Sequence, residues 1–128
     1  MRYSSSTDVG VRRSSNEDAY LANGTVFAVA DGMGGHLAGE VASGIAIDCL
    51  GDLGGARASE RTLLNRFERA NTIIYDRARA DADRRGMGTT LTACLVDENR
   101  LYNALWTKTA STSATLEIPA FIAFAAAD

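Results

Sequence analysis

The chain has 128 residues, of which 46% are hydrophobic and 23% are charged, and its formal net charge is −3. This length and composition fit one domain with a buried core and argue against a disordered chain. The acidic balance also argues against a general nucleic-acid-binding protein, which usually presents a basic stripe.

The two cysteines, Cys49 and Cys94, lie far apart and outside any CxxC pattern. This spacing favours buried thiols over a disulfide framework or a zinc site. The first ten residues, MRYSSSTDVG, lack the apolar core of a secretion signal, and the longest nearly apolar run is too short for a membrane helix. We therefore expect a reduced, cytoplasmic protein with neither a membrane nor a nucleic acid as partner.

Two strands joined by a tight turn are predicted near the start of the chain. The segments DAYLA (18–22) and TVFAVA (25–30, extending to residue 31) have strand composition, and Asn23–Gly24 between them is a strong hairpin signal. The opening segment RYSSSTDVG is a weaker candidate for another strand.

Two helices are predicted over 37–53 and 59–84. The first has an apolar stripe at spacings of three and four: Ala38, Val41, Ala42, Ile45, Cys49 and Leu53. The second begins after Ser59, a suitable N-cap, and its stripe consists of Leu63, Phe67, Ala70, Ile74 and Ala78. Gly54 and Gly55 end the first helix. The arginines late in the second helix alternate with aspartates, which is typical of a solvated face.

A second hairpin is predicted from TTLTACLV and RLYNALW, which flank residues 97–99. Strands, two helices and again strands form an α+β pattern, not alternating βαβ units. Residues 107–128 differ in being low in complexity and nearly uncharged, so we divide the chain into 1–106 and 107–128. We expect this tail to lie outside the sheet, and Pro119 favours a short helix after it.

Asp31 ends a buried strand and is followed by four glycines within eight residues. Glycines allow backbone to pass close to a ligand, and they expose carbonyls such as that of Gly32. Carboxylate and carbonyl oxygens are the ligands that magnesium and manganese prefer. Taken alone, these residues fit a tight strand-to-helix turn with a surface aspartate better than a metal site.

An acidic pair, Glu17–Asp18, shifts this weighting toward a metal site. In an antiparallel hairpin the start of one strand lies beside the end of the next, so all three acids should meet at one end of the sheet. A bound cation would relieve their repulsion. Arg13 is either a clamp for phosphate or a solvated surface residue. His36, the only histidine, fits a water-facing residue in the first helical turn better than a ligand.

Three stretches resemble the metal-dependent protein serine/threonine phosphatases (PPM family, protein phosphatase 2C type) in their bacterial form. They are TDVGVRRSSNEDAY, VFAVADGMGGHLAGEVAS and GMGTTLTACLVDENRLY, and together they span about residues 3–102. The resemblance implies part of a β-sandwich flanked by helices, and a two-metal site for Mn²⁺ or Mg²⁺ at one end of it.

Residue by residue, the resemblance implies that Asp31 bridges the two metals and that Gly32 supplies a carbonyl ligand. It implies that Glu17 and Asp18 hold metals directly or through waters, and that Arg13 binds phosphate. The substrate implied is a phosphoprotein carrying phosphoserine or phosphothreonine. Met33 stands where some members have a histidine proposed as general acid, and that role does not transfer to His36.

The chain departs from the family after RLYNA, where a Gly-Asp-Ser-Arg segment and two later aspartates are expected. We therefore expect an N-terminal portion of a phosphatase domain that hydrolyses phosphoesters very poorly. Two alternatives stay open. One is a non-catalytic module that binds metal or phosphopeptide, and the other is a nucleotide-binding domain. The latter is the weaker, because the sequence has no GxxxxGK[ST] motif.

Overall fold

The computed structural model describes residues 2–12, 14–53, 59–97, 100–106 and 120–125, and it describes side chains up to residue 96 except that of His36. The described strands form one antiparallel sheet in the order β1-β2-β4-β5-β6, and the short β3 pairs with the end of β2. The strands are β1 (Asp18–Ala22), β2 (Val26–Met33), β3 (Gly88–Thr89), β4 (Leu91–Asp97), β5 (Arg100–Trp106) and β6 (Ala120–Ala125).

The predicted first hairpin is present, and its turn is held by a side chain. Asn23 Oδ1 accepts hydrogen bonds from the backbone N–H groups of Thr25 (3.0 Å) and Val26 (2.7 Å). Gly24 has a φ of 90°, a conformation that suits glycine. The turn sets the register in which Ala22 lies opposite Phe27 and Asp18 lies opposite Asp31.

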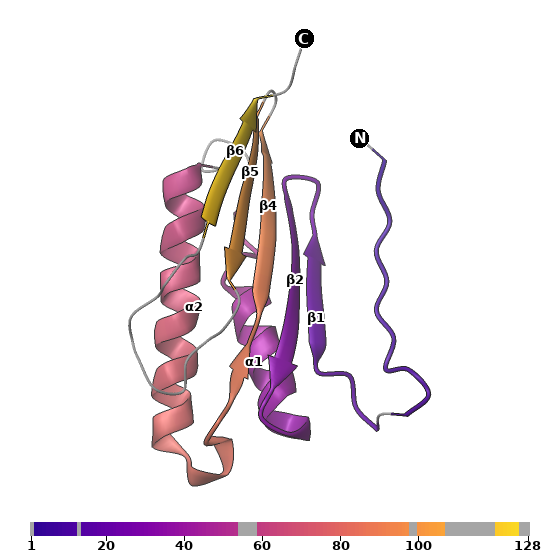
Figure 1. Cartoon of the computed structure of the whole chain (residues 1–128), viewed down its shortest axis with the longest axis vertical. Coiled ribbons are helices and arrows are strands. Elements are labelled where there is room, and N and C mark those ends of the chain that lie inside the picture. Colours follow the sequence, from indigo (N-terminus) through magenta and orange to yellow (C-terminus); the bar gives the residue numbers. More distant parts are fainter. Residues whose placement is uncertain (1, 13, 54–58, 98–99, 107–119, 126–128) are drawn as a thin grey trace.

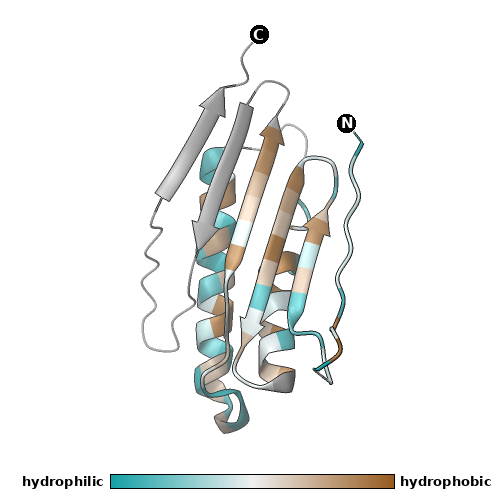
Figure 2. Cartoon of the chain, turned by 45° about the vertical axis from the view of Figure 1, so that its right-hand side comes forward, coloured by the Kyte–Doolittle hydropathy of each residue, from teal (hydrophilic) through white to brown (hydrophobic). Residues whose placement is uncertain are grey.

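Two helices, α1 (His36–Asp48) and α2 (Glu60–Ala80), lie on one side of the sheet, as Figures 1 and 2 show. Their inner faces cover the alternate residues of the central strands that point toward them. The apolar stripe predicted for α2 is fully buried, and that of α1 is buried except for the half-buried Val41. The central strands contribute Val26, Ala28, Ala30, Leu91, Ala93 and Leu95 to the same core.

Both helices end earlier than the sequence predicts. The chain leaves α1 after Asp48 through a series of single turns, in which Leu50 N–H bonds to the Ile47 carbonyl at 2.9 Å. Ser59 is the N-cap of α2 as predicted, and it forms a capping box with Thr62. Asp81 is extended and ends α2, and a separate 3₁₀ turn follows at Ala82–Arg84.

The tail differs from our expectation. Residues 120–125 form strand β6, whose backbone pairs with β5 from Leu105↔Ala120 to Arg100↔Ala125. A helix directly after Pro119 and a tail wholly outside the sheet are therefore both wrong for this segment. The outer edge of β5 offers unpaired N–H and C=O groups, and the backbone of β6 pairs with them. Residues 107–119 lie outside the described part of the chain, and the proposed domain boundary stays a prediction.

The face of the sheet away from the helices carries exposed and half-buried side chains. Tyr20 lies opposite Val29, Val29 opposite Thr92, and Phe27 opposite Cys94. The opening residues 2–9 do not form the strand that we considered, and they run as an irregular segment beside β1 (Figure 1).

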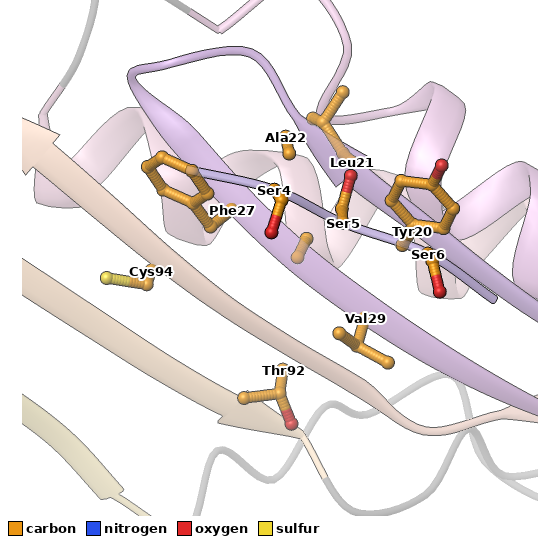
Figure 3. Close-up of a pocket in the computed structure, with 11 residues that line it drawn as sticks. Ser4, Ser5, Ser6, Tyr20, Leu21, Ala22, Phe27, Val29, Thr92 and Cys94 are labelled. Carbon is orange, nitrogen blue, oxygen red and sulfur yellow. The ribbon is translucent and has the colours of Figure 1, made fainter. Parts of the chain in front are cut away.

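The opening segment contacts this open face. The Tyr3 ring meets the Phe27 ring edge-on, with centroids 5.0 Å apart. A cavity of about 420 Å³ lies between Ser4–Ser6 and the open face, as Figure 3 shows.

Candidate active site at one end of the sheet

The pairing of β1 with β2 brings the predicted acids to one end of the sheet. Asp18 and Asp31 are direct cross-strand partners, so their side chains share a face. The backbone N–H of Gly32 donates to the carbonyl of Glu17 at 3.1 Å. The backbone juxtaposition expected from the Asn23–Gly24 turn is therefore present.

Asp31 is fixed on its other side by Thr90, which lies between β3 and β4. The Asp31 N–H donates to Thr90 Oγ1 at 3.2 Å, and the Thr90 N–H donates to the Asp31 carbonyl at 2.8 Å. The Asp31 side chain nevertheless stays exposed. A rigid backbone thus presents a hydrated carboxylate. The sequence reasoning assigned no role to Thr90, although it falls within the GMGTT stretch.

Gly32 lies where no larger residue fits. A Cβ at this position would overlap the backbone of Gly39 in α1 and come within 2.6 Å of the Glu17 carbonyl oxygen. Gly39 is less restricted, because a Cβ there would overlap the Glu17 carboxylate, which can move, and would approach the backbone of Gly32 to 3.1 Å. The two glycines therefore let β2 pass directly over the first turns of α1. Glycine inside a helical pattern is a signal of such close approach, and the sequence reasoning did not use it for Gly39.

The Glu17 side chain does not follow the two aspartates. Its carboxylate packs against Gly39, near the N-terminal end of α1, where the helix dipole favours a negative charge. Consecutive residues of an extended chain point to opposite faces, and this separates Glu17 from Asp18. The described residues accordingly contain no group of three or more histidine, cysteine or acidic side chains placed to hold one metal ion. The three acids therefore meet at one end of the sheet through their backbone, and their assignment as metal ligands stays a prediction.

A cavity of about 630 Å³ nevertheless joins Glu17 to Asp31. It is lined by Arg12, Ser14, Ser15, Glu17, Asp31, Gly32, Met33 and Gly34. Within the part of the chain with described side chains, Ser15 Oγ is the buried side-chain atom without a hydrogen-bond partner. An orphaned hydroxyl in a polar cavity is a place for a water or an oxygen-bearing ligand.

The glycine-rich turn from β2 into α1 forms the rim of this cavity. Gly34 and Gly35 have φ values of 121° and 86°, and Gly35 is the N-cap of α1 without a side-chain cap. A Cβ at Gly34 would come within 2.9 Å of the Gly86 carbonyl oxygen, so the turn packs against the loop after α2. Arg13 and the His36 side chain lie outside the described part of the chain, so the phosphate-binding role of Arg13 and the water-facing orientation of His36 stay predictions.

The two cysteines lie away from this site. Both are free, with Cys49 buried in the core and Cys94 half-buried on the open face. Burial raises the pKa of each thiol above its ordinary value, and for Cys49 the nearby Arg69 opposes the shift. The predicted burial of the thiol is thus confirmed for Cys49, whereas the Cys94 side chain is only half-buried.

No protein-family model matches the chain. Its sequence is 43% identical over 104 residues to the serine/threonine protein phosphatase PstP of Mycobacterium tuberculosis. The matched region covers 79% of this chain and 20% of PstP. It is 38% identical over 111 residues to the serine/threonine phosphatase stp of Listeria monocytogenes, and this matched region covers 74% of this chain and 42% of that protein. The chain therefore spans less than half the length of these curated relatives.

Solved structures agree with the sequence comparison. The catalytic domain of PstP, solved in complex with two manganese ions, superposes with a TM-score of 0.75 at 39% identity, and covers 82% of this chain and 47% of that one. PppA of Pseudomonas aeruginosa, at 23% identity, shares the fold with a TM-score of 0.74. None of the described helices is both long and apolar enough to cross a membrane. Over its N-terminal four-fifths the chain is a homologue of the bacterial protein phosphatase 2C-type serine/threonine phosphatases, and its α+β fold matches part of the PPM phosphatase domains.

Proposed function

We propose that the chain carries the N-terminal part of a metal-dependent protein serine/threonine phosphatase site. The observation that supports this most is the cross-strand pair Asp18–Asp31, held beside a polar cavity at one end of the sheet. The substrate would be a cytoplasmic phosphoprotein carrying phosphoserine or phosphothreonine.

The donor set at this end of the sheet fits a hard divalent cation. The two aspartates offer carboxylate oxygens, Gly32 offers a backbone carbonyl, and such oxygens suit Mg²⁺ and Mn²⁺. The unpartnered Ser15 hydroxyl in the same cavity suits a water bound next to such an ion. Asp31 and Gly32 would hold the metals, with Asp18 and Glu17 acting directly or through waters.

Bound manganese or magnesium would supply an activated water and would offset the charge that develops on the phosphoryl oxygens. The chain itself contributes rigidity and space. Thr90 fixes the Asp31 backbone, and Gly32 keeps side-chain bulk out of the corner. Arg12 lines the cavity and Arg13 follows it in the sequence, so an arginine there would bind the substrate phosphate.

We further propose that this chain alone turns over phosphoesters weakly or not at all. Two aspartates and a carbonyl leave most of the coordination positions of two cations to water, and weakly held cations are not fixed about 3.5–4 Å apart as in-line displacement requires. The alternative is a non-catalytic module that binds metal or phosphopeptide, and the diverging Glu17 side chain favours it.

Turnover of p-nitrophenyl phosphate with excess manganese tests this proposal. The chain is compared with Asp31→Ala and with the matched control Asp76→Ala, an exposed aspartate on α2. We expect equal background rates in all three. Robust turnover that Asp31→Ala abolishes and Asp76→Ala preserves would contradict weak activity, and would show that this half of the site suffices.

A further inference from the structure

A second charged cavity lies between the two helices, away from the acids. It has a volume of about 310 Å³ and is lined by Ile45, Asp48, Cys49, Asp52, Arg66, Arg69, Ile73 and Arg77. We call this cavity the interhelical groove. It is built from α1, the turn after it, and α2, and no role assigned to the phosphatase site uses it.

The charges of the groove are only partly compensated. Arg66 is bound to Asp52 at 2.7 Å, which leaves two arginines and Asp48 among the lining residues. Arg69 and Arg77 are exposed, and neither forms a hydrogen bond or ion pair with another described residue. Two guanidinium groups are therefore available to bind an anion.

The floor of the groove is apolar or uncharged. Ile45 from α1 and Ile73 from α2 both line it, together with the buried Cys49. Burial raises the pKa of the Cys49 thiol, so this side chain stays neutral at ordinary pH. The groove thus offers an apolar strip between separated positive charges.

The positions of Arg69 and Arg77 along α2 determine how far apart two acidic groups of a ligand should lie. Arg69, Ile73 and Arg77 follow one another at four-residue steps, so they lie in a row on one helix face. Eight residues at about 1.5 Å each separate the two arginines by about 12 Å along the axis. In an extended peptide, residues four apart are about 13 Å apart and share a face with the residue midway between them.

We propose that the interhelical groove binds an extended acidic peptide in which two carboxylates, four residues apart, flank an apolar side chain. The carboxylates pair with Arg69 and Arg77, and the apolar side chain rests on Ile73 and Ile45. Asp48 on the opposite wall makes a uniformly acidic peptide less suitable than a spaced one. This docking surface goes beyond the proposed phosphatase function, and its test uses no hydrolysis.

Fluorescence anisotropy with labelled peptides measures this binding on the full chain. The probe is Gly-Glu-Ser-Leu-Ser-Glu-Gly, and its control, Gly-Ser-Leu-Glu-Glu-Ser-Gly, has the same composition but adjacent acids. We expect the spaced peptide to bind at least about threefold more tightly, and its affinity to fall with added salt. Equal affinities would overturn the proposal, because they would indicate attraction to charge without spacing.

Substitutions identify the arginines. We expect Arg69→Gln together with Arg77→Gln to weaken binding of the spaced peptide about tenfold, since each exposed pair contributes modestly. Arg79 is the matched control, because it lies two residues beyond Arg77, off the groove, and its guanidinium sits 5.5 Å from the centre of the Tyr75 ring. An equal loss in Arg79→Gln would overturn the proposal.

A charge swap gives an independent check on the same surface. The variant with both Arg69→Glu and Arg77→Glu should no longer bind the spaced acidic peptide. It should bind Gly-Lys-Ser-Leu-Ser-Lys-Gly with an affinity similar to that of the original chain for the acidic peptide. If the swapped chain does not prefer the lysine peptide, the spacing argument fails.

Discussion

Val26 and Val29 are both valines in strand β2, yet one side chain is buried and the other is exposed to solvent. Val26 faces the helices and is 0% exposed, whereas Val29 faces away from them and is 58% exposed. Alternation along β2 explains the difference, because successive side chains point to opposite faces of a sheet. One face is covered by α1 and α2, and the other is touched in part by residues near the N-terminus.

The same alternation separates stability from chemistry. Asp18 and Asp31 belong to the open face, where both side chains are exposed and stay hydrated. The covered face holds the strands in place through its core, and so fixes the register that brings the two acids together. The open face can then present charges without losing stability to desolvation.

The largest expected effect comes from breaking the contact between the sheet and α1. Gly32→Ala places a methyl group into the backbone of Gly39, and we expect it to lower the free energy of unfolding by about 3 kcal/mol. Urea denaturation measures this. The control is Gly44→Ala in α1, where a Cβ meets nothing within 4 Å. This substitution should raise the free energy of unfolding by about 0.5–1 kcal/mol, because alanine favours the helix over glycine. Equal stabilities of the two variants would contradict the close packing.

The two valines give a matched comparison of the faces. We expect Val26→Ala to cost about 2 kcal/mol, because it removes buried methyl groups and leaves a cavity. Val29→Ala should change the free energy of unfolding by about 0.5 kcal/mol or less, since that side chain is largely exposed. Similar losses would mean that the open face is covered in solution.

The pH dependence of stability tests the burial of Cys49 in the core and of Cys94 on the open face. Burial raises the pKa of Cys49 and Cys94 from 9.0, so folding favours the protonated thiols. Their contribution to stability is complete below pH 9 and is lost as pH rises through the folded pKa values. We expect the midpoint in urea to fall above pH 9, and to fall less in Cys49→Ala than in the original chain when each is referred to its value at pH 7.

Much of this arrangement follows from local patterns. The Asn23–Gly24 turn and the apolar alternation predict the hairpin, and the hairpin predicts that Asp18 meets Asp31. The helical stripe around Phe67 is equally local, because it repeats at the helical period over about four turns.

The features that sequence reasoning missed depend on contacts between distant segments. Glu17 turns toward α1 because Gly39 leaves room for its carboxylate, and spacing alone does not reveal that room. The run AFIAFA is short enough to suit a helix or a strand, and the open edge of β5 decides between them. The early end of α1 likewise follows from the turn at Leu50, not from the apolar stripe, which continues to Leu53.

If the Asp18–Asp31 pair holds a divalent cation on the open face, as we propose, manganese should stabilise the folded chain. Thermal unfolding is followed over a manganese titration in the chain, in Asp31→Asn, and in the exposed control Asp76→Asn. At ten times its dissociation constant, manganese should stabilise the chain and the control by about 1.4 kcal/mol, and it should not stabilise Asp31→Asn. The same manganese-dependent stabilisation in Asp31→Asn as in the other two would contradict the account.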